Sequence, residues 1–251
     1  MLRQYYPPIE ISGFISSILI INKFTTPIKI YPGTGAEIWI STSDLCLLTD
    51  SHQTVSQYQL VIPRINTFTA KPNNAKVIVI LVRHDAVRFL LPERTLIYTD
   101  KPTALANIWQ NPWYEELARA SFKGLLECFI ETKQSKKTQL VDEILSILYR
   151  TPTKKINDIA DEIGYSSRFI QKEFLKEYGI TPKRYQINCR LEQLLKAMLK
   201  EQDTYRWLET GYYDQSHFYR DFKRYFTMTP SEFMKSTYSF FYNTKIKRRL
   251  R

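Results

Sequence analysis

Short runs of β-branched, aliphatic and aromatic residues dominate the first hundred residues of the chain. They have the length of strands, and segments rich in Pro, Gly, Asn and Ser, such as 32–35 and 71–76, separate them. The runs are FISSILII, IKIY, EIWI, LCLL, YQLVI and KVIVILV. This pattern predicts an antiparallel sandwich or barrel over residues 1–100.

The pattern becomes helical after Thr103. Apolar residues recur there close to helical spacing, at positions 117, 122, 125, 126 and 129. We therefore predict a helical connector over residues 101–135, which either caps the sheet or forms a dimer seam, because spacing alone does not separate these alternatives. The polar stretch 131–138 is the predicted linker to the next domain.

The second half of the chain contains one unit twice, at an offset near 48 residues. The matched positions are Phe174 with Phe222, Tyr178 with Phe226, Thr181-Pro182 with Thr229-Pro230, and Tyr185 with Phe233. Two copies are too few for a solenoid, so we expect a domain built from a pair of similar units over residues 136–236.

Each unit is predicted to be a helix, a tight turn and a second helix. In the first copy, apolar residues fall at i, i+3, i+4 and i+7 from Ile156, and Gly164 supplies the left-handed conformation that ends this helix. Ser166 or Ser167 then caps the second helix, while Asp214 is the predicted cap in the second copy.

The outward faces of the two second helices carry side chains that recognise base edges. Arg and Lys donate to guanine, and Gln pairs with adenine, in the major groove. Two short helices at a tight turn, the second with such a face, form the helix-turn-helix reader of DNA. The alternative is a hairpin of helices with a solvated charged face, which two matching copies make less plausible.

A long helix is predicted between the copies. Thr181-Pro182 and Thr229-Pro230 each place a capping hydroxyl before a proline at the first helical position, and Thr229 to Glu232 has capping-box spacing. An apolar stripe then runs from Ile187 to Leu199. A helix over 182–200 would span about 28 Å and could hold the two recognition helices about one duplex turn apart.

Charge points to the same half. Residues 1–135 hold 13 basic and 11 acidic residues, whereas the remainder holds 23 and 14, so most of the net charge of +11 lies in the second half. A polyanion, nucleic acid before acidic lipid, is therefore the expected partner. The tail 237–251 is basic and either grips the DNA backbone or only aids solubility.

Other functional classes find little support. There is no GxGxxG or GxxxxGK[ST] motif, and the three cysteines show neither CxxC spacing nor the density of a disulfide scaffold. His52 and His84 are solitary, and we find no catalytic constellation. We predict no enzyme activity, no cofactor, no metal and no membrane segment, in a cytoplasmic protein. Tyr31, Trp39, Tyr58 and Phe68 either line a small-molecule pocket or, as we prefer, form the core of the barrel.

From Lys137 to Ser236 the chain resembles the AraC/XylS family of transcriptional regulators. The motifs are IADEIGYSSRFIQKEFLKEYGITPKRY and GYYDQSHFYRDFKRYFTMTPSEF. The second is the more specific, and its signature residues are Gly211, Phe218, Arg220, Phe222, Lys223, Thr229 and Pro230. The resemblance implies an α+β protein with two helix-turn-helix units joined by a long helix, and a variable N-terminal domain, often a cupin-like barrel, that senses effectors or dimerises.

By position, the resemblance and the outward faces give two sets of site residues. The predicted base contacts are Arg168, Gln171, Lys172, Gln215, Ser216, His217 and Arg220. The predicted phosphate contacts are Ser167, Lys183, Arg184, Arg190, Lys223 and Arg224. His217 is alternatively a polar residue beside the recognition face.

The chain departs from the family pattern in two places. Thr227 stands where the family usually has Gly. In the first helix of the second copy, Arg206, Trp207 and Thr210 stand where the first copy has Ile159, Ala160 and Ile163, so that helix is expected to pack differently.

We therefore predict a sequence-specific DNA-binding transcriptional regulator, modulated through its N-terminal domain. Double-stranded DNA is the expected partner, and RNA polymerase, a small-molecule effector and a second copy of the chain are further candidates. The alternatives are a non-specific nucleic-acid-binding or architectural protein and, with less support, a ligand-binding or enzymatic barrel.

Overall fold

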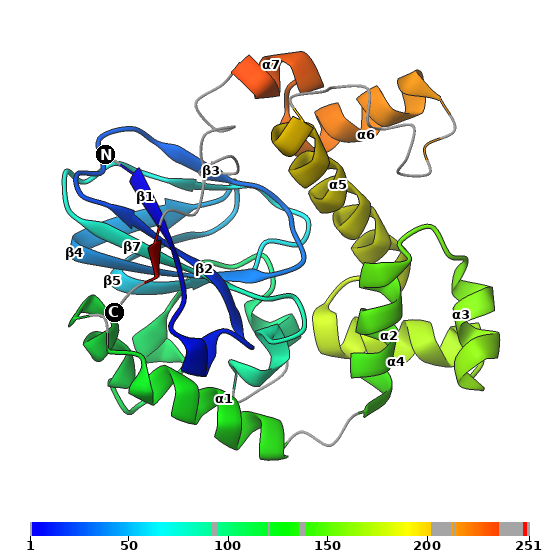
Figure 1. The fold of residues 1–251 in the computed structure, drawn as a ribbon, viewed down its shortest axis with the longest axis horizontal. Coiled ribbons are helices and arrows are strands. Elements are labelled where there is room, and N and C mark those ends of the chain that lie inside the picture. The colour runs from blue at the N-terminus through cyan, green and yellow to red at the C-terminus, as the bar shows by residue number, and fades with distance from the viewer. Residues whose placement is uncertain are drawn as a thin grey trace.

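The computed structural model describes residues 2–91, 95–119, 121–135, 139–201, 212, 214–235 and 248–249, and shows a β-rich N-terminal part followed by helices (Figure 1). The strands are β1 (Leu2–Tyr6), β2 (Ile15–Ile21), β3 (Ile28–Ile30), β4 (Ala36–Leu48), β5 (Gln53–Val61), β6 (Phe68–Ala70), β7 (Val77–Val82), β8 (Thr103–Ala104) and β9 (Arg248–Arg249). The α-helices are α1 (Lys123–Ser135), α2 (Gln139–Arg150), α3 (Ile156–Ile163), α4 (Ser167–Tyr178), α5 (Pro182–Glu201), α6 (Gln215–Phe226) and α7 (Pro230–Lys235). Five 3-10 helices are η1 (Ile9–Ile11), η2 (Val87–Phe89), η3 (Thr95–Tyr98), η4 (Leu105–Asn107) and η5 (Trp113–Arg119).

The sheet is antiparallel in its main body and buries both of its faces. Its order is β3-β6-β4-β7-β2-β1-β9, with β5 paired to β4 and β8 to β5. Along β4, Ile38 and Ile40 belong to one core cluster, whereas Trp39 between them belongs to a second. The alternation of side chains along a strand thus divides the apolar residues between two cores. The predicted α+β class, with a β-rich N-terminal part and a helical C-terminal part, is confirmed.

Two details of the sheet differ from the prediction. EIWI and LCLL belong to one strand, β4, which stays paired across a register shift between Ile40 and Leu45. Five steps along β4, from Ile40 to Leu45, match only two along β5, so the pairing with β5 is interrupted there and resumes at Leu45. The strands β1, β6, β8 and β9 were not predicted, because LRQYY is half polar, FTA has only three residues, and β8 and β9 have two residues each.

The connector packs against the first core. Leu125 and Phe129 of α1 are fully buried there, and the Phe129 ring stacks on Phe14 at 4.4 Å between centroids. The helix α1 therefore caps the sheet, one of the two roles considered for it (Figure 1). Residues 131–135 of the predicted linker belong to this helix, since no helix-breaking residue interrupts it.

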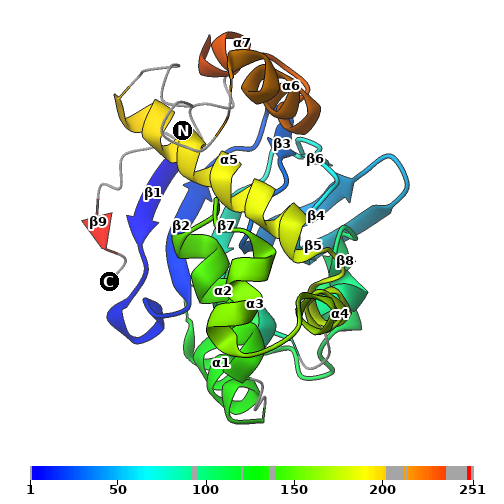
Figure 2. The same ribbon diagram turned by 90° about the vertical axis from the view of Figure 1, so that its right-hand side faces the viewer.

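The helical part has two cores that share α5. The first half of α5 packs with α2, α3 and α4 through residues that include Ile159, Phe174 and Tyr185. Its second half packs with α6 and α7, and Tyr31 of the N-terminal part joins that cluster. The helical part is thus attached to the sheet through apolar contacts as well as through its chain connection (Figure 2).

Candidate nucleic-acid interface and interdomain cavity

The helix α4 presents the first predicted recognition face to solvent. Gly164 ends α3 with a φ of 72°, and Ser166 accepts a hydrogen bond from the Phe169 amide at 3.2 Å, so the predicted turn and cap are present. The buried side is formed by Ile170, Phe174 and Tyr178, each 0% exposed. The opposite side holds the exposed predicted base contacts Arg168, Gln171 and Lys172.

The helix α6 repeats this arrangement. Asp214 accepts from the His217 amide at 2.7 Å and caps the helix, as predicted. Phe218 and Phe222 are fully buried. Solvent reaches the side chains of the predicted base contacts Gln215, Ser216 and Arg220. His217 is half-buried, with its Nε2 atom 3.6 Å from the Asp221 carboxylate.

The cationic side chains on these faces are available for an external partner. Within the part of the chain that the structure describes, Arg168, Lys172 and Arg220 form no ion pair. The helix α5 has 20 residues and therefore spans about 30 Å. Figures 1 and 2 place α5 between the two recognition helices, with α4 below it and α6 above it.

The predicted phosphate contacts divide into exposed and buried groups. Lys183, Lys223 and Arg224 are exposed. Ser167 is half-buried, and its hydroxyl donates to Asn157 at 2.7 Å.

Two arginines of this set lie against aromatic rings. The half-buried Arg184 guanidinium lies over the Tyr225 ring at 4.4 Å. Arg190 is 9% exposed and lies over Tyr212 at 5.2 Å. This placement is at odds with a phosphate contact for Arg190, because its cation is already packed inside the domain.

The left-handed turn after α6 forms without glycine. Thr227 has a φ of 58° and its amide donates to the Lys223 carbonyl at 2.9 Å, so it closes the helix as Gly179 does after α4. The capping box is also present, since Glu232 accepts from the Thr229 amide at 2.7 Å. Arg206, Trp207, Thr210 and Gly211, and most of the basic tail, lie outside the described residues.

A cavity of about 180 Å³ lies between the N-terminal part and α5. Its apolar wall comes from both parts and includes Tyr31, Val82, Leu195 and Phe226. Tyr31 therefore lines a cavity, whereas Trp39 and Phe68 are core residues and Tyr58 packs against Tyr114.

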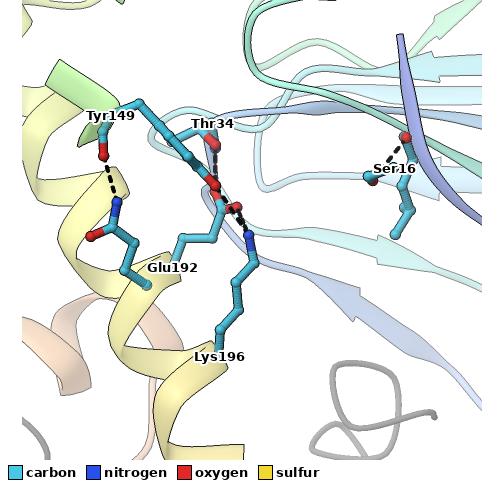
Figure 3. A network of polar contacts seen from close by, with 7 residues as sticks. Ser16, Thr34, Tyr149, Glu192 and Lys196 are labelled. Atoms are coloured by element: carbon cyan, nitrogen blue, oxygen red, sulfur yellow. Dashed lines mark hydrogen bonds and ion pairs between the residues drawn. The ribbon is translucent and has the colours of Figure 1, made fainter. Parts of the chain in front are cut away.

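The α5 side of the cavity carries a polar network (Figure 3). Glu192 accepts from Thr34 of the N-terminal part and from Lys196 at 2.6 Å, and Lys196 also reaches the Tyr149 hydroxyl at 3.3 Å. Burial alone would raise the pKa of Glu192, but Lys196 and Thr34 together lower it. Glu192 and Lys196 thus neutralise each other at this end of the cavity.

The sheet side of the cavity carries a second carboxyl group, Glu37 of β4. The Trp39 indole donates to its Oε2 atom at 2.7 Å. Burial raises the pKa of Glu37 to about 7 in spite of this hydrogen bond. Among the described residues, no cationic side chain forms an ion pair with Glu37.

Buried polar groups join the cavity loop, residues 32–35, to α5. Asn188 donates to the carbonyls of Gly33 and Arg64 at 3.0 Å each. The fully buried Arg64 donates to the Gly33 and Gly35 carbonyls at 3.0 and 2.7 Å. A side chain at position 35 would lie 2.4 Å from the Val82 carbonyl oxygen, so glycine is required there. These contacts hold the loop Pro32–Gly35 in place.

Sequence reasoning missed this polar set. Asn188, Glu192 and Lys196 recur every four residues on α5 and so share one face of the helix, which was a detectable signal. They were overlooked because the apolar stripe of the same helix explained its burial.

Comparison with known proteins identifies the type of domain that the helical part forms. Residues 148–236 match the family model of a helix-turn-helix domain. The chain carries an AraC-type helix-turn-helix domain. This AraC-type domain includes both candidate recognition helices, α4 and α6.

Other similarities extend over more of the chain. An uncharacterized HTH-type transcriptional regulator, YidL of Escherichia coli K12, is 24% identical over 131 residues, which cover 48% of this chain and 42% of YidL. The structure of ToxT from Vibrio cholerae has 14% identity and a TM-score of 0.56, and the match covers 93% of this chain and 98% of that one. Unsaturated fatty acid bound ToxT has a TM-score of 0.50, 14% identity and coverage of 93% and 94%. The ToxT fold thus matches the sheet as well as the AraC-type domain.

Two kinds of feature are absent from the described residues. None of their helices is both long and apolar enough to cross a membrane. No group of three or more His, Cys, Asp and Glu side chains among them could hold a metal ion.

Proposed function

We propose that this protein is a sequence-specific DNA-binding transcriptional regulator. The observation that carries the proposal is the pair of exposed, unpaired faces on α4 and α6, which hold Arg168, Gln171 and Arg220 within the AraC-type domain. Such side chains donate to guanine or pair with adenine in the major groove. A separation set by the 20-residue α5 suits two successive major-groove segments.

The assignment of individual contacts is part of this proposal. The base contacts would be Arg168, Gln171, Lys172, Gln215, Ser216, His217 and Arg220. Lys183, Lys223 and Arg224 are exposed and suit phosphate, which fixes the register without reading sequence. Ser167 and Arg184 are half-buried and already contact Asn157 and Tyr225, so they suit phosphate less well than these three.

The test is selection of bound fragments from genomic DNA, followed by competition with a scrambled duplex. We expect fragments that share two adjacent elements, and binding that weakens steeply as salt rises. Equal competition by the scrambled duplex would instead identify a non-specific or architectural nucleic-acid-binding protein.

We also infer that a small molecule controls DNA binding through the interdomain cavity. The cavity is shared by the N-terminal part and α5, and Phe226 of its wall ends the helix α6. The structure of unsaturated fatty acid bound ToxT is a precedent for a ligand in this fold. Linkage requires that a ligand which changes DNA affinity has its own affinity changed equally by DNA. Titration of ligand with and without duplex tests this.

Intracellular localisation and association with RNA polymerase or a second copy of the chain belong to the same proposal, because a regulator acts where the chromosome and the polymerase are. Co-sedimentation of the chain with its selected duplex, with and without polymerase, measures the two associations.

A further inference from the structure

The lining of the cavity between the sheet and α5 includes two carboxyl groups and one lysine, and their arrangement is asymmetric. Glu192 and Lys196 form an ion pair at 2.6 Å on the α5 side. Glu37 lies on the sheet side, where the one hydrogen bond described for its side chain comes from Trp39. The cavity therefore contains one carboxyl group that no cation of the described residues neutralises.

The rest of the wall is largely apolar. Tyr31, Leu195 and Phe226 contribute aromatic and aliphatic surface, and the backbone of Pro32–Gly35 closes one side. The volume of about 180 Å³ exceeds the roughly 150 Å³ that holds a benzene molecule in an apolar cavity. An aromatic ring with a short arm is therefore of the right size.

We propose that this cavity binds a small apolar molecule with an ammonium or amidinium group, and that Glu37 pairs with that cation. The proposal names the ligand class for the effector site and so rests on the effector part of the proposed function. A carboxylic acid is disfavoured by this charge arrangement, because its anion would meet Glu37, while the lysine of the described wall is already paired with Glu192.

The energetics favour a cation at this position. A half-buried carboxylate without a counter-ion carries a desolvation cost that is reflected in its raised pKa. An ammonium group within hydrogen-bond distance of Glu37 offsets that cost and gains a charge-assisted hydrogen bond. The apolar part of the same ligand removes the cavity wall from water.

The experiment compares three probes that share a phenethyl group, with the full chain, by isothermal titration calorimetry. Phenethylamine is the cation, phenethyl alcohol is the neutral analogue and hydrocinnamate is the anion. The titrations are run near pH 8, about one unit above the pKa of about 7, so that Glu37 is ionised. We expect phenethylamine to bind roughly 10-fold or more tightly than phenethyl alcohol, with hydrocinnamate the weakest.

Glu37→Gln is the decisive variant, because glutamine keeps the shape and still accepts from Trp39. It should abolish the preference for the amine and leave the affinity for the alcohol unchanged. The matched control is Glu10→Gln, which removes an exposed carboxyl group of η1 outside the cavity and should leave all three affinities unchanged.

Three results would overturn the proposal: tighter binding of hydrocinnamate than of phenethylamine, an amine preference that survives Glu37→Gln, or no binding of any probe at millimolar concentration. Its failure is separable from failure of the proposed function. Probe selectivity is measured without DNA, whereas effector control is tested by the change in duplex affinity on adding phenethylamine. Selective binding that leaves duplex affinity unchanged would keep the ligand class and remove the effector role.

Discussion

The Tyr225 hydroxyl on α6 donates to the Asn188 side-chain oxygen on α5 at 2.8 Å. Asn188 uses its amide nitrogen to hold the carbonyls of Gly33 and Arg64 in the N-terminal part. One buried amide group therefore connects the cavity loop, the long helix and the second recognition helix. The orientation of α6 depends on the loop that lines the cavity.

Asn188→Ala is predicted to destabilise the chain by about 2 kcal/mol, because it leaves a buried hydroxyl and two buried carbonyls without this partner. Urea titration of both proteins measures the change. The control is Asn107→Ala at an exposed position of η4, which should stay within about 0.5 kcal/mol of wild type. Equal stability of all three proteins would contradict the role given to Asn188.

Arg220→Ala and Gln171→Ala are predicted to relax base preference at the positions they contact. Each lost bidentate contact should cost about 1–3 kcal/mol on the selected duplex and much less on a scrambled one. Lys183→Ala, at an exposed position near the start of α5, should instead weaken both duplexes alike. Titrations of both duplexes at fixed salt separate the two kinds of loss. An Arg220 variant with unchanged preference would remove that residue from the recognition face.

Substitutions at two of the left-handed helix ends, Thr227 and Gly164, are predicted to change stability in opposite directions. Thr227 adopts a φ of 58° with a β-branched side chain, so Thr227→Gly should stabilise the chain by about 1 kcal/mol. Gly164 has a φ of 72°, and no atom lies within 4 Å of the place that an added methyl group would take. Gly164→Ala should therefore cost about 1 kcal/mol through backbone conformation alone. Thermal unfolding of both variants tests the signs, and two shifts in the same direction would be inconsistent with this account.

The Glu37 carboxyl is predicted to make stability depend on pH. Burial raises its pKa from 4.5 to about 7, so the folded chain keeps a proton that the unfolded chain releases in this range. The contribution of Glu37 to the free energy of unfolding should therefore fall as pH rises from about 4.5 to 7, by at most about 3 kcal/mol. The other carboxyl of the cavity, Glu192, has a lowered pKa and titrates below this window.

Urea titrations across this range measure the effect in wild type and in Glu37→Gln. The glutamine variant should lose this part of the pH dependence, whereas Glu10→Gln should retain it. A pH profile that Glu37→Gln leaves unchanged would show that the carboxyl is solvated in the folded chain.

Local patterns predicted the elements of this fold better than their connections. The spacing of Ile159 and Ala160 and the caps at Ser166 and Asp214 depend on neighbours within one helical turn, so the sequence displays them directly. The joining of EIWI and LCLL into β4 depends on pairing with other strands: β5 pairs with both parts, β7 with the first part and β6 with the second. Pattern alone cannot supply such long-range pairing.

The residues of the candidate site also divide into those that local sequence patterns could predict and those that depend on tertiary contacts. The exposed faces of α4 and α6 follow from helical periodicity, which places Arg168 and Arg220 opposite the buried aromatic residues. The burial of Arg190 follows from its packing on Tyr212, and the cavity at Glu37 follows from the approach of α5 to the sheet. Both require tertiary contacts that no periodicity encodes.

In the proposed complex, α5 holds the two recognition helices at one fixed separation on one face of the duplex. The most direct measurement is the affinity of the full chain for its selected duplex after half a turn, roughly five base pairs, is inserted between the two elements. We predict that affinity falls about 100-fold or more, to that of a single element, because the second element rotates to the opposite face. Unchanged affinity for the lengthened duplex would contradict this arrangement.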